Sequence, residues 1–187
     1  MAKRIAVMLA EGFEEIETVT VVDILRRAGG RVSLISLFDN TESVKGSRGV
    51  YFVPDSGISV LSDADFDAIV LPGGLPGTTN LHADKTVKDT LLRMNSDGKL
   101  IASICAATSI LADYGITSGK NATSHPAFKE QTDINDTIYS DERVVVDGNI
   151  VTSRSPGTAM EFAFALVEQL YGSEMVEKVN AGVLARL

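Results

Sequence analysis

Cysteine and histidine are nearly absent from this chain. Its 187 residues include one cysteine, Cys105, and two histidines, His82 and His125. A single cysteine excludes an intrachain disulfide framework and a metal site built from several thiolates, and it suits a reducing compartment. Two histidines cannot build a three-histidine metal site, and no metal-binding motif is present. We therefore expect a cytoplasmic protein that holds no metal and needs no cofactor.

The chain also lacks a hydrophobic run long enough to cross a bilayer and a cluster of basic residues. Its first apolar run, residues 5–10, follows Lys3 and Arg4 but stops at Glu11 without a small-residue cleavage site. That pattern predicts a first strand rather than a signal peptide. The 17 Lys and Arg against 25 Asp and Glu give a net charge of −8, which argues against nonspecific binding to nucleic acid. We expect neither a membrane nor a nucleic acid as a partner.

What is present is typical of a globular protein, with 44% hydrophobic and 22% charged residues. The length suits one domain with a substantial core and is short for two. No repeat, linker or low-complexity tract divides the sequence. We expect one domain over residues 1–187.

Apolar runs and helical patterns alternate along the chain. We expect buried strands over residues 4–10, 31–37, 66–71 and 99–104, a short edge strand over 50–53, local pairing at 58–60, and a hairpin over 143–152. Helices are expected over residues 14–28, 84–95, 105–115, 158–170 and 173–184, and residues 117–137 are expected to be irregular. This alternation predicts an α/β fold with a mainly parallel sheet covered on both faces.

The junction at Cys105 is the most informative stretch. The apolar run 99–104 is too short for a helix and ends abruptly at Cys105, after which helix-compatible residues continue to Gly115. A strand that turns directly into a helix with a nucleophile at the turn is a nucleophile elbow. The N–H groups at the helix start favour a thiolate over a thiol. The alternative is an inert buried thiol, which is the commonest state of a free cysteine.

Three carboxylates, Glu14, Glu15 and Glu17, lie where the first strand passes into the first helix. Ligands of open α/β sheets bind beyond the carboxyl ends of the strands, where Cys105 also lies. One carboxylate beside the thiol would carry a proton to and from a carbonyl compound. For Glu14 and Glu17 we prefer the simpler role of stabilising the helix start.

Backbone donors and a histidine are also candidates for this edge of the sheet. Gly73 and Gly74 form a tight turn, and their N–H groups, with that of Ala106, would face a developing oxyanion. His125 is a candidate base for a Cys–His pair, although a histidine beside proline in a loop is otherwise unremarkable. His82 is expected to be a solvated surface residue.

Taken together, these residues resemble the DJ-1/PfpI (ThiJ) superfamily, and within it the DJ-1-type branch. The resemblance covers essentially the whole chain, and it is carried by residues 3–18, 23–29, 47–48, 67–74, 102–107, 124–126 and 152–158. It implies a flavodoxin-like three-layer α/β sandwich, a nucleophile elbow and a homodimer.

The resemblance also implies roles for individual residues. Cys105 matches the family's reactive low-pKa cysteine, and Glu15 matches the glutamate whose protonated carboxyl hydrogen-bonds that sulfur. Gly73, Gly74 and Ala106 match the backbone donors beside it. Arg48 matches an arginine that reaches the site across the dimer interface, and Arg154 lies in a matching loop near the pocket. His125 matches a pocket histidine that is poorly placed to act as a base.

Three functions remain open from the sequence. The first is a glutathione-independent glyoxalase or protein deglycase that acts on methylglyoxal and related dicarbonyls through a hemithioacetal on Cys105. The second is an oxidative-stress sensor or chaperone that works through oxidation of the same thiolate to a sulfinate. The third, a cysteine peptidase, needs a competent histidine base and is the least favoured.

Overall fold

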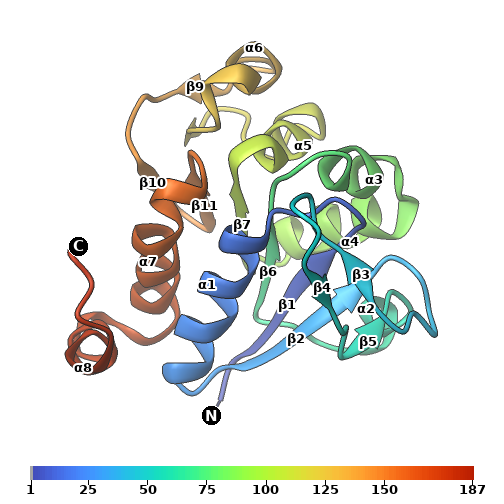
Figure 1. The fold of residues 1–187 in the computed structure, drawn as a ribbon. Helices are drawn as coiled ribbons and strands as arrows, with labels where there is room; N and C mark the ends of the chain where they lie inside the picture. The colour runs from blue at the N-terminus through green and yellow to red at the C-terminus, as the bar shows by residue number, and fades with distance from the viewer. Residues whose placement is uncertain (1) are drawn as a thin grey trace.

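A seven-stranded sheet in the order β10-β11-β7-β6-β1-β2-β5 forms the centre of the molecule (Figure 1). The computed structural model describes residues 2–187, apart from the side chain of Asp63. The strands are β1 (Arg4–Leu9), β2 (Arg31–Ser36), β3 (Val44–Lys45), β4 (Tyr51–Phe52), β5 (Ser56–Gly57), β6 (Ala68–Leu71), β7 (Leu100–Ile104), β8 (Asn121–Ala122), β9 (Ile138–Tyr139), β10 (Val144–Asp147) and β11 (Ile150–Ser153). The central strands pair in parallel, and only β10 runs antiparallel to its neighbour β11.

Helices cover both faces of this sheet (Figure 1). The α-helices are α1 (Glu15–Arg27), α2 (Val60–Asp63), α3 (Gly77–Ala83), α4 (Lys85–Ser96), α5 (Thr108–Asp113), α6 (Lys129–Thr132), α7 (Ala159–Tyr171) and α8 (Ser173–Val183), and the 3-10 helices are η1 (Cys105–Ala107), η2 (Pro126–Phe128) and η3 (Pro156–Thr158). The mainly parallel α/β sandwich expected from the sequence is confirmed.

Two hydrophobic cores form because alternate residues of a strand point to opposite faces of the sheet. In β1, Ile5 and Val7 belong to the core that α1 and α7 cover, whereas Ala6 and Met8 belong to the core beneath α4 and α5. All four side chains are fully buried. Strands buried on both faces read as continuous apolar runs, which is the pattern that the sequence shows.

Three strands bring functional residues to one edge. β1, β6 and β7 are hydrogen-bonded neighbours that run in parallel, so their carboxyl ends meet at the same edge of the sheet. β1 leads to α1, β6 leads to the turn at Gly73 and Gly74, and β7 leads to Cys105. The candidate site is therefore assembled by topology.

The structure corrects several local expectations. The short edge strand expected over residues 50–53 is β4, which pairs with β3 in a separate two-stranded hairpin, and its Phe52 packs on Phe13 with ring centroids 4.9 Å apart. β5 takes the edge position beside β2, and α2 replaces the pairing expected at residues 58–60. α3 precedes the expected helix over residues 84–95, and the stretch 117–137 contains β8 and α6. No helix among residues 2–187 combines the length and hydropathy needed to cross a membrane.

Candidate functional site

Cys105 sits at a strained turn between β7 and η1. Its φ angle is 63°, in the left-handed region that L residues seldom adopt, and the backbone is extended at Ile104 just before it. Tertiary packing holds the turn, since the neighbours Ile104 and Ala106 are almost fully buried. The thiol itself is only half-buried, and it is not in a disulfide. A strained, partly exposed residue of this kind is typical of a functional position.

Glu17 is the carboxylate beside the sulfur. It lies in the first turn of α1 with no exposed surface, and its carboxyl group is close enough to Cys105 to influence the pKa of the thiol. Its Oε2 accepts a 2.8 Å hydrogen bond from the backbone N–H of Gly73. Its other oxygen, Oε1, is buried and has no hydrogen-bond partner among the described residues. A buried carboxyl with one unpaired oxygen suits the protonated state, because burial of the charge is costly.

Burial controls the protonation of this pair. It raises the pKa of Glu17 to about 8, opposed by the hydrogen bond from Gly73 and reinforced by the charge of Glu14. Burial, followed by the charge of Glu17, raises the pKa of Cys105 to about 12. The sequence led us to expect a lowered pKa for this thiol. With Glu17 charged, the pKa of Cys105 is instead raised. When Glu17 holds a proton, the charge that raises the pKa of Cys105 is removed and a hydrogen-bond donor takes its place.

Glu15 lies elsewhere, and its expected contact with the sulfur is wrong. Its carboxylate accepts hydrogen bonds from the Ser47 hydroxyl at 3.1 Å and from the backbone N–H of Arg48 at 2.6 Å. A longer bond of 3.4 Å comes from the N–H of Val50. Although burial opposes it, these donors together hold the pKa of Glu15 below its ordinary value. Glu15 fastens the turn between β3 and β4 to the start of α1.

Helix geometry explains why Glu17 and not Glu15 reaches the sulfur. Successive residues of a helix are rotated by about 100°, so carboxylates two positions apart point in clearly different directions. Glu14 caps the helix by accepting a 2.8 Å hydrogen bond from the N–H of Glu17. The sequence offers three glutamates within four positions. Glu17 could have been singled out by one feature: it lies on the same face of the helix as Val21 and Leu25, which are both buried.

Backbone donors surround the sulfur. The N–H groups of Gly74 and Ala106 hydrogen-bond it, whereas that of Gly73 is committed to Glu17. The glycines are required by close approach as well: a Cβ on Gly73 would lie 2.7 Å from the Cβ of Cys105. Gly74 has a φ angle of 91°, and a Cβ there would lie 2.5 Å from the carbonyl oxygen of Gly12. The turn after β6 therefore fits against Cys105 only without side chains.

A cavity of about 350 Å³ opens over Cys105. Glu14, Arg48, His125 and Phe128 contribute to its lining. Its size is that of a site for a small organic molecule, and the sulfur is exposed to it. The cavity combines one nucleophile, backbone donors, a cationic side chain and an apolar wall.

Of the other residues expected at the site, His125 and Arg48 line the cavity over Cys105, whereas Arg154 does not. His125 lines the cavity, but its Nδ1 accepts a 3.1 Å hydrogen bond from the N–H of Ala127. Arg48 lines the cavity of its own chain. Arg154 points elsewhere: its guanidinium donates to the carbonyl of Asp141 at 2.7 Å and pairs with the Asp141 carboxylate at 3.6 Å. The expectation that Arg154 lies near the pocket is not supported by these contacts.

Metal ligands are not gathered in the described part of the chain. Within residues 2–187, no group of three or more His, Cys, Asp and Glu side chains is arranged to hold a metal ion.

Comparison with known proteins identifies relatives over the whole chain. A family model described as DJ-1/PfpI matches residues 3–169. The chain is 45% identical over 184 residues to Protein dj-1beta of Drosophila melanogaster, with 98% of each chain covered. It is 35% identical over 164 residues to the glutathione-independent glyoxalase DJR-1.2 of Caenorhabditis elegans, with 88% of this chain and 86% of the relative covered.

Solved structures agree with this relationship. The crystal structure of Drosophila melanogaster DJ-1beta superposes with a TM-score of 0.95 at 44% identity, covering all of both chains. The structure of oxidized Toxoplasma gondii DJ-1 gives a TM-score of 0.93 at 37% identity, again over all of both chains. The flavodoxin-like architecture expected from the sequence is shared with these neighbours.

Proposed function

Because the chain belongs to the DJ-1/PfpI family, we propose that it converts small reactive dicarbonyls such as methylglyoxal to hydroxy acids without glutathione. The observation that carries this proposal is the half-buried Cys105, which lines a cavity of about 350 Å³ and has the buried carboxyl of Glu17 beside it. A nucleophile and a proton carrier in contact are the two groups that this isomerisation needs.

The first step joins the substrate to the sulfur. In the pair that holds one proton, the Glu17 carboxylate removes the proton of the Cys105 thiol as the sulfur attacks the aldehyde carbon of methylglyoxal, and Glu17 then passes that proton to the aldehyde oxygen. The product is a hemithioacetal. The N–H groups of Gly74 and Ala106, which already face the sulfur, stabilise negative charge on that oxygen as the carbon–sulfur bond forms.

The second step moves protons between the two former carbonyl carbons. The Glu17 carboxylate removes the hydrogen from the carbon bonded to sulfur, and an enediol forms. Return of a proton to the neighbouring carbon gives a lactoyl thioester. Water then hydrolyses the thioester, which releases lactate and restores the thiol. One water is added overall and no electrons are exchanged with another molecule, so the reaction as written needs no redox cofactor. Deglycation of proteins is the related outcome when free dicarbonyl is removed from equilibrium with its adducts.

Lactate formation from methylglyoxal without added thiol tests this proposal. We expect turnover by the unaltered chain and loss of more than about 1,000-fold in Cys105→Ala, because Cys105 is the one thiol of the chain and supplies the sulfur that forms the hemithioacetal. Glu168→Gln is the control, since Glu168 is exposed on α7 away from the cavity. Full turnover by Cys105→Ala, or none by the unaltered chain, contradicts the proposal.

A second candidate function is redox sensing through Cys105. When Glu17 is protonated at its unpaired Oε1, that O–H and the N–H groups of Gly74 and Ala106 can donate to oxygens added to the sulfur. The Toxoplasma gondii neighbour is a DJ-1 described as oxidized, which supports this chemistry in a relative. Mild peroxide should then add two oxygens to Cys105, as detected by mass spectrometry. Absence of a selective gain on that peptide excludes the sensing role.

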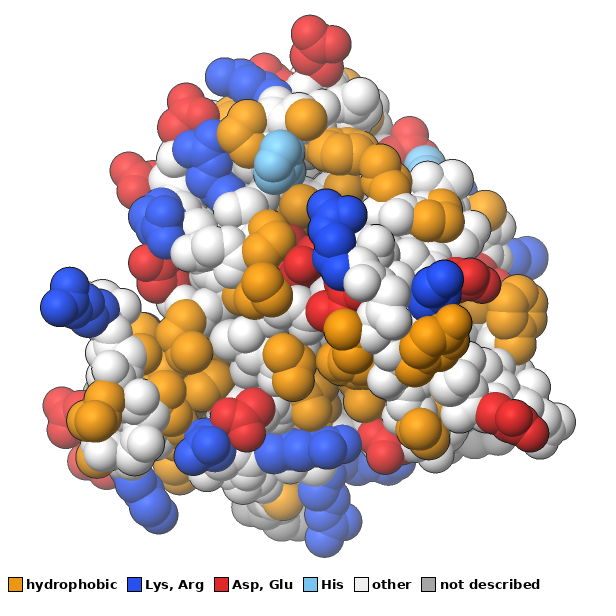
Figure 2. All heavy atoms as spheres, in the orientation of Figure 1, with side chains coloured by type: hydrophobic (Ala, Val, Ile, Leu, Met, Phe, Trp, Pro, Cys, Tyr) orange, Lys and Arg blue, Asp and Glu red, His pale blue; other side chains and the backbone are white. Residues whose placement is uncertain are grey.

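We also propose that the chain forms a homodimer in the cytoplasm. Ile16 and Val19 on α1 and Val50 after the β3–β4 turn are each about half exposed (53%, 49% and 51%). Figure 2 shows hydrophobic side chains gathered along this face of the molecule. Exposed apolar side chains on one face are typical of an interaction surface. A second copy on this surface would lie next to Arg48, which lines the cavity of its own chain.

A further inference from the structure

A second cavity is lined in part by the β3–β4 hairpin, through Val44, Lys45 and Tyr51. It has a volume of about 200 Å³ and is found where β1 and β2 end, at the edge where open α/β sheets bind ligands. No residue lines both this cavity and the one over Cys105. Its function is therefore separable from that of the thiol.

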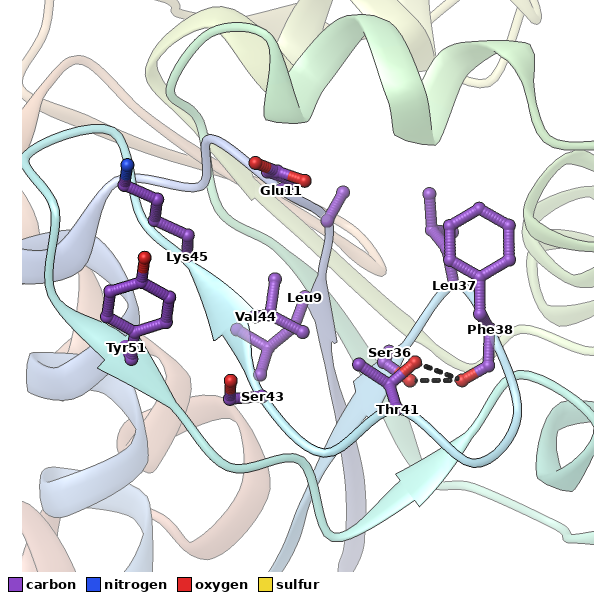
Figure 3. Close-up of a pocket in the computed structure, with 11 residues that line it drawn as sticks. Leu9, Glu11, Ser36, Leu37, Phe38, Thr41, Ser43, Val44, Lys45 and Tyr51 are labelled. Carbon is purple, nitrogen blue, oxygen red and sulfur yellow. Dashed lines mark hydrogen bonds between the residues drawn. The ribbon is translucent and has the colours of Figure 1, made fainter.

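The floor of this second cavity is apolar and its two ends differ (Figure 3). Leu9, Leu37 and Val44 are buried, and they supply most of the floor. At one end stand the side chains of Lys45 and Tyr51, with the Lys45 ammonium 6.0 Å from the centre of the Tyr51 ring. At the other end are Leu37 and Phe38 (Figure 3), and the Phe38 ring is 73% exposed.

Charges of opposite sign face this cavity. Glu11 and Lys45 both line it, and neither forms an ion pair with another residue of the described chain. Glu11 and Lys45 come from different segments and are placed separately in Figure 3. A simple anion would be attracted by Lys45 and repelled by Glu11, and a simple cation would meet the reverse. A ligand that carries both charges satisfies both residues.

The hydroxyl groups that line this cavity differ in whether they can donate or accept a hydrogen bond. Ser36 and Thr41 both donate to the carbonyl oxygen of Phe38, so each oxygen retains only its capacity to accept. These two hydroxyls lie beside Phe38 and apart from Glu11 (Figure 3), so Glu11 is the acceptor for an ammonium group. The phenol of Tyr51 has no hydrogen-bond partner in the described structure, and it stands beside Lys45 as a donor to a carboxylate.

Size narrows the ligand further. Pockets for drug-sized ligands and cofactors hold roughly 300–1,000 Å³, so a cavity of about 200 Å³ is too small for a nucleotide. It matches a free amino acid with a medium-sized apolar side chain, which would lie over Leu37 and Phe38.

We propose that this cavity binds a free zwitterionic α-amino acid with an apolar side chain. Lys45 and Tyr51 hold the carboxylate, Glu11 holds the ammonium group, and the side chain covers the floor and the Phe38 ring. This site is independent of dicarbonyl chemistry at Cys105, so its failure and failure of the proposed glyoxalase are separate results.

Calorimetric titration of the full chain with L-leucine tests the proposal. Two matched probes each lack one charge: 4-methylpentanoate has no ammonium group, and 3-methylbutylamine has no carboxylate. We expect L-leucine to bind and both probes to bind at least about tenfold more weakly, because each leaves one protein charge unpaired. No binding of L-leucine up to about 10 mM, or equal binding of either probe, overturns the proposal.

Two variants assign the binding to this cavity. Lys45→Met and Glu11→Gln should each weaken L-leucine binding by about tenfold or more. Their matched controls are Lys88→Met and Glu168→Gln, which remove the same charges on α4 and α7, outside the cavity. Circular dichroism and urea unfolding of all four variants should match those of the unaltered chain, which shows that each folds. Unchanged L-leucine affinity in both cavity variants places the binding elsewhere and refutes the site.

Discussion

At the scale of single residues, the main feature is a carboxyl group with no exposed surface beside a half-buried thiol. Glu17 accepts one hydrogen bond from Gly73, contacts Cys105 and leaves Oε1 unpaired. Interacting groups of this kind lose their protons as a pair. In the state with one proton, the Glu17 carboxylate stands beside the Cys105 thiol and can take its proton as the sulfur attacks, and we assign the chemistry to that state.

The raised pKa of Glu17 predicts how stability changes with pH. Glu17 has a pKa of about 8 in the folded chain and an ordinary value of 4.5, so the folded state holds a proton that the unfolded state releases between these values. Its contribution to stability is complete below pH 4.5 and is lost as pH rises to 8, up to roughly 5 kcal/mol. Glu17→Gln should not lose stability in this way, because an amide does not release a proton in this pH range.

Urea unfolding of both chains from pH 4.5 to 9 measures the effect. The free energy of unfolding of Glu17→Gln should rise relative to the unaltered chain across this range. Parallel profiles for the two chains contradict a buried, protonated Glu17.

At the scale of secondary-structure elements, the junction of β7 and η1 stores strain at Cys105. A φ angle of 63° costs an L residue about 1–2 kcal/mol relative to glycine. We therefore expect the free energy of unfolding of Cys105→Gly to exceed that of Cys105→Ala by about 1 kcal/mol. Denaturant unfolding of the two variants measures this difference. Both variants lack the thiol, so the comparison isolates the backbone. Equal stability of the two variants means that the turn is not strained.

The hairpin of β3 and β4 depends on Glu15. Glu15→Ala removes the acceptor for the N–H groups of Arg48 and Val50, which leaves them without that partner. We expect faster hydrogen exchange at these two amides, corresponding to roughly 1–3 kcal/mol of lost protection, with little change in β1. Ser47→Ala removes one weaker donor and should have a smaller effect. Unchanged exchange in Glu15→Ala excludes the proposed anchoring.

The sequence predicts elements better than it predicts the direction in which their side chains point. Continuous apolar runs identified β1, β2, β6 and β7, and the Asp147-Gly148 turn identified the β10–β11 hairpin, because these signals are local. The face of α1 was not predictable in the same way. Apolar residues lie nearly all round this helix: Val21 and Leu25 are buried, whereas Ile16 and Val19 are exposed.

The same ambiguity explains the misplaced carboxylate. The side of α1 that faces β7 depends on packing between elements far apart in the chain, and this choice decides which glutamate meets Cys105. The convergence of Gly74 and Cys105 was predictable because parallel strands end at one edge. The contact of Arg154 with Asp141 was not predictable from the sequence, because it depends on the conformation of two loops.

At the scale of the whole molecule, the exposed apolar side chains of α1 predict self-association. Light scattering after size-exclusion chromatography should give twice the mass of one chain at micromolar concentration. Val19→Asp introduces a charge into the proposed interface and should give a monomer, because the charge would be desolvated on association. A monomeric unaltered chain contradicts the proposed homodimer.

Cys105 works with Glu17, and not with Glu15, in the chemistry we propose. Steady-state conversion of methylglyoxal to lactate by Glu17→Gln and Glu15→Gln tests this assignment most directly. We predict that Glu17→Gln lowers kcat by about 100-fold or more, because an amide cannot carry the proton, whereas Glu15→Gln retains kcat within about tenfold. Normal turnover in Glu17→Gln together with loss of turnover in Glu15→Gln would contradict it.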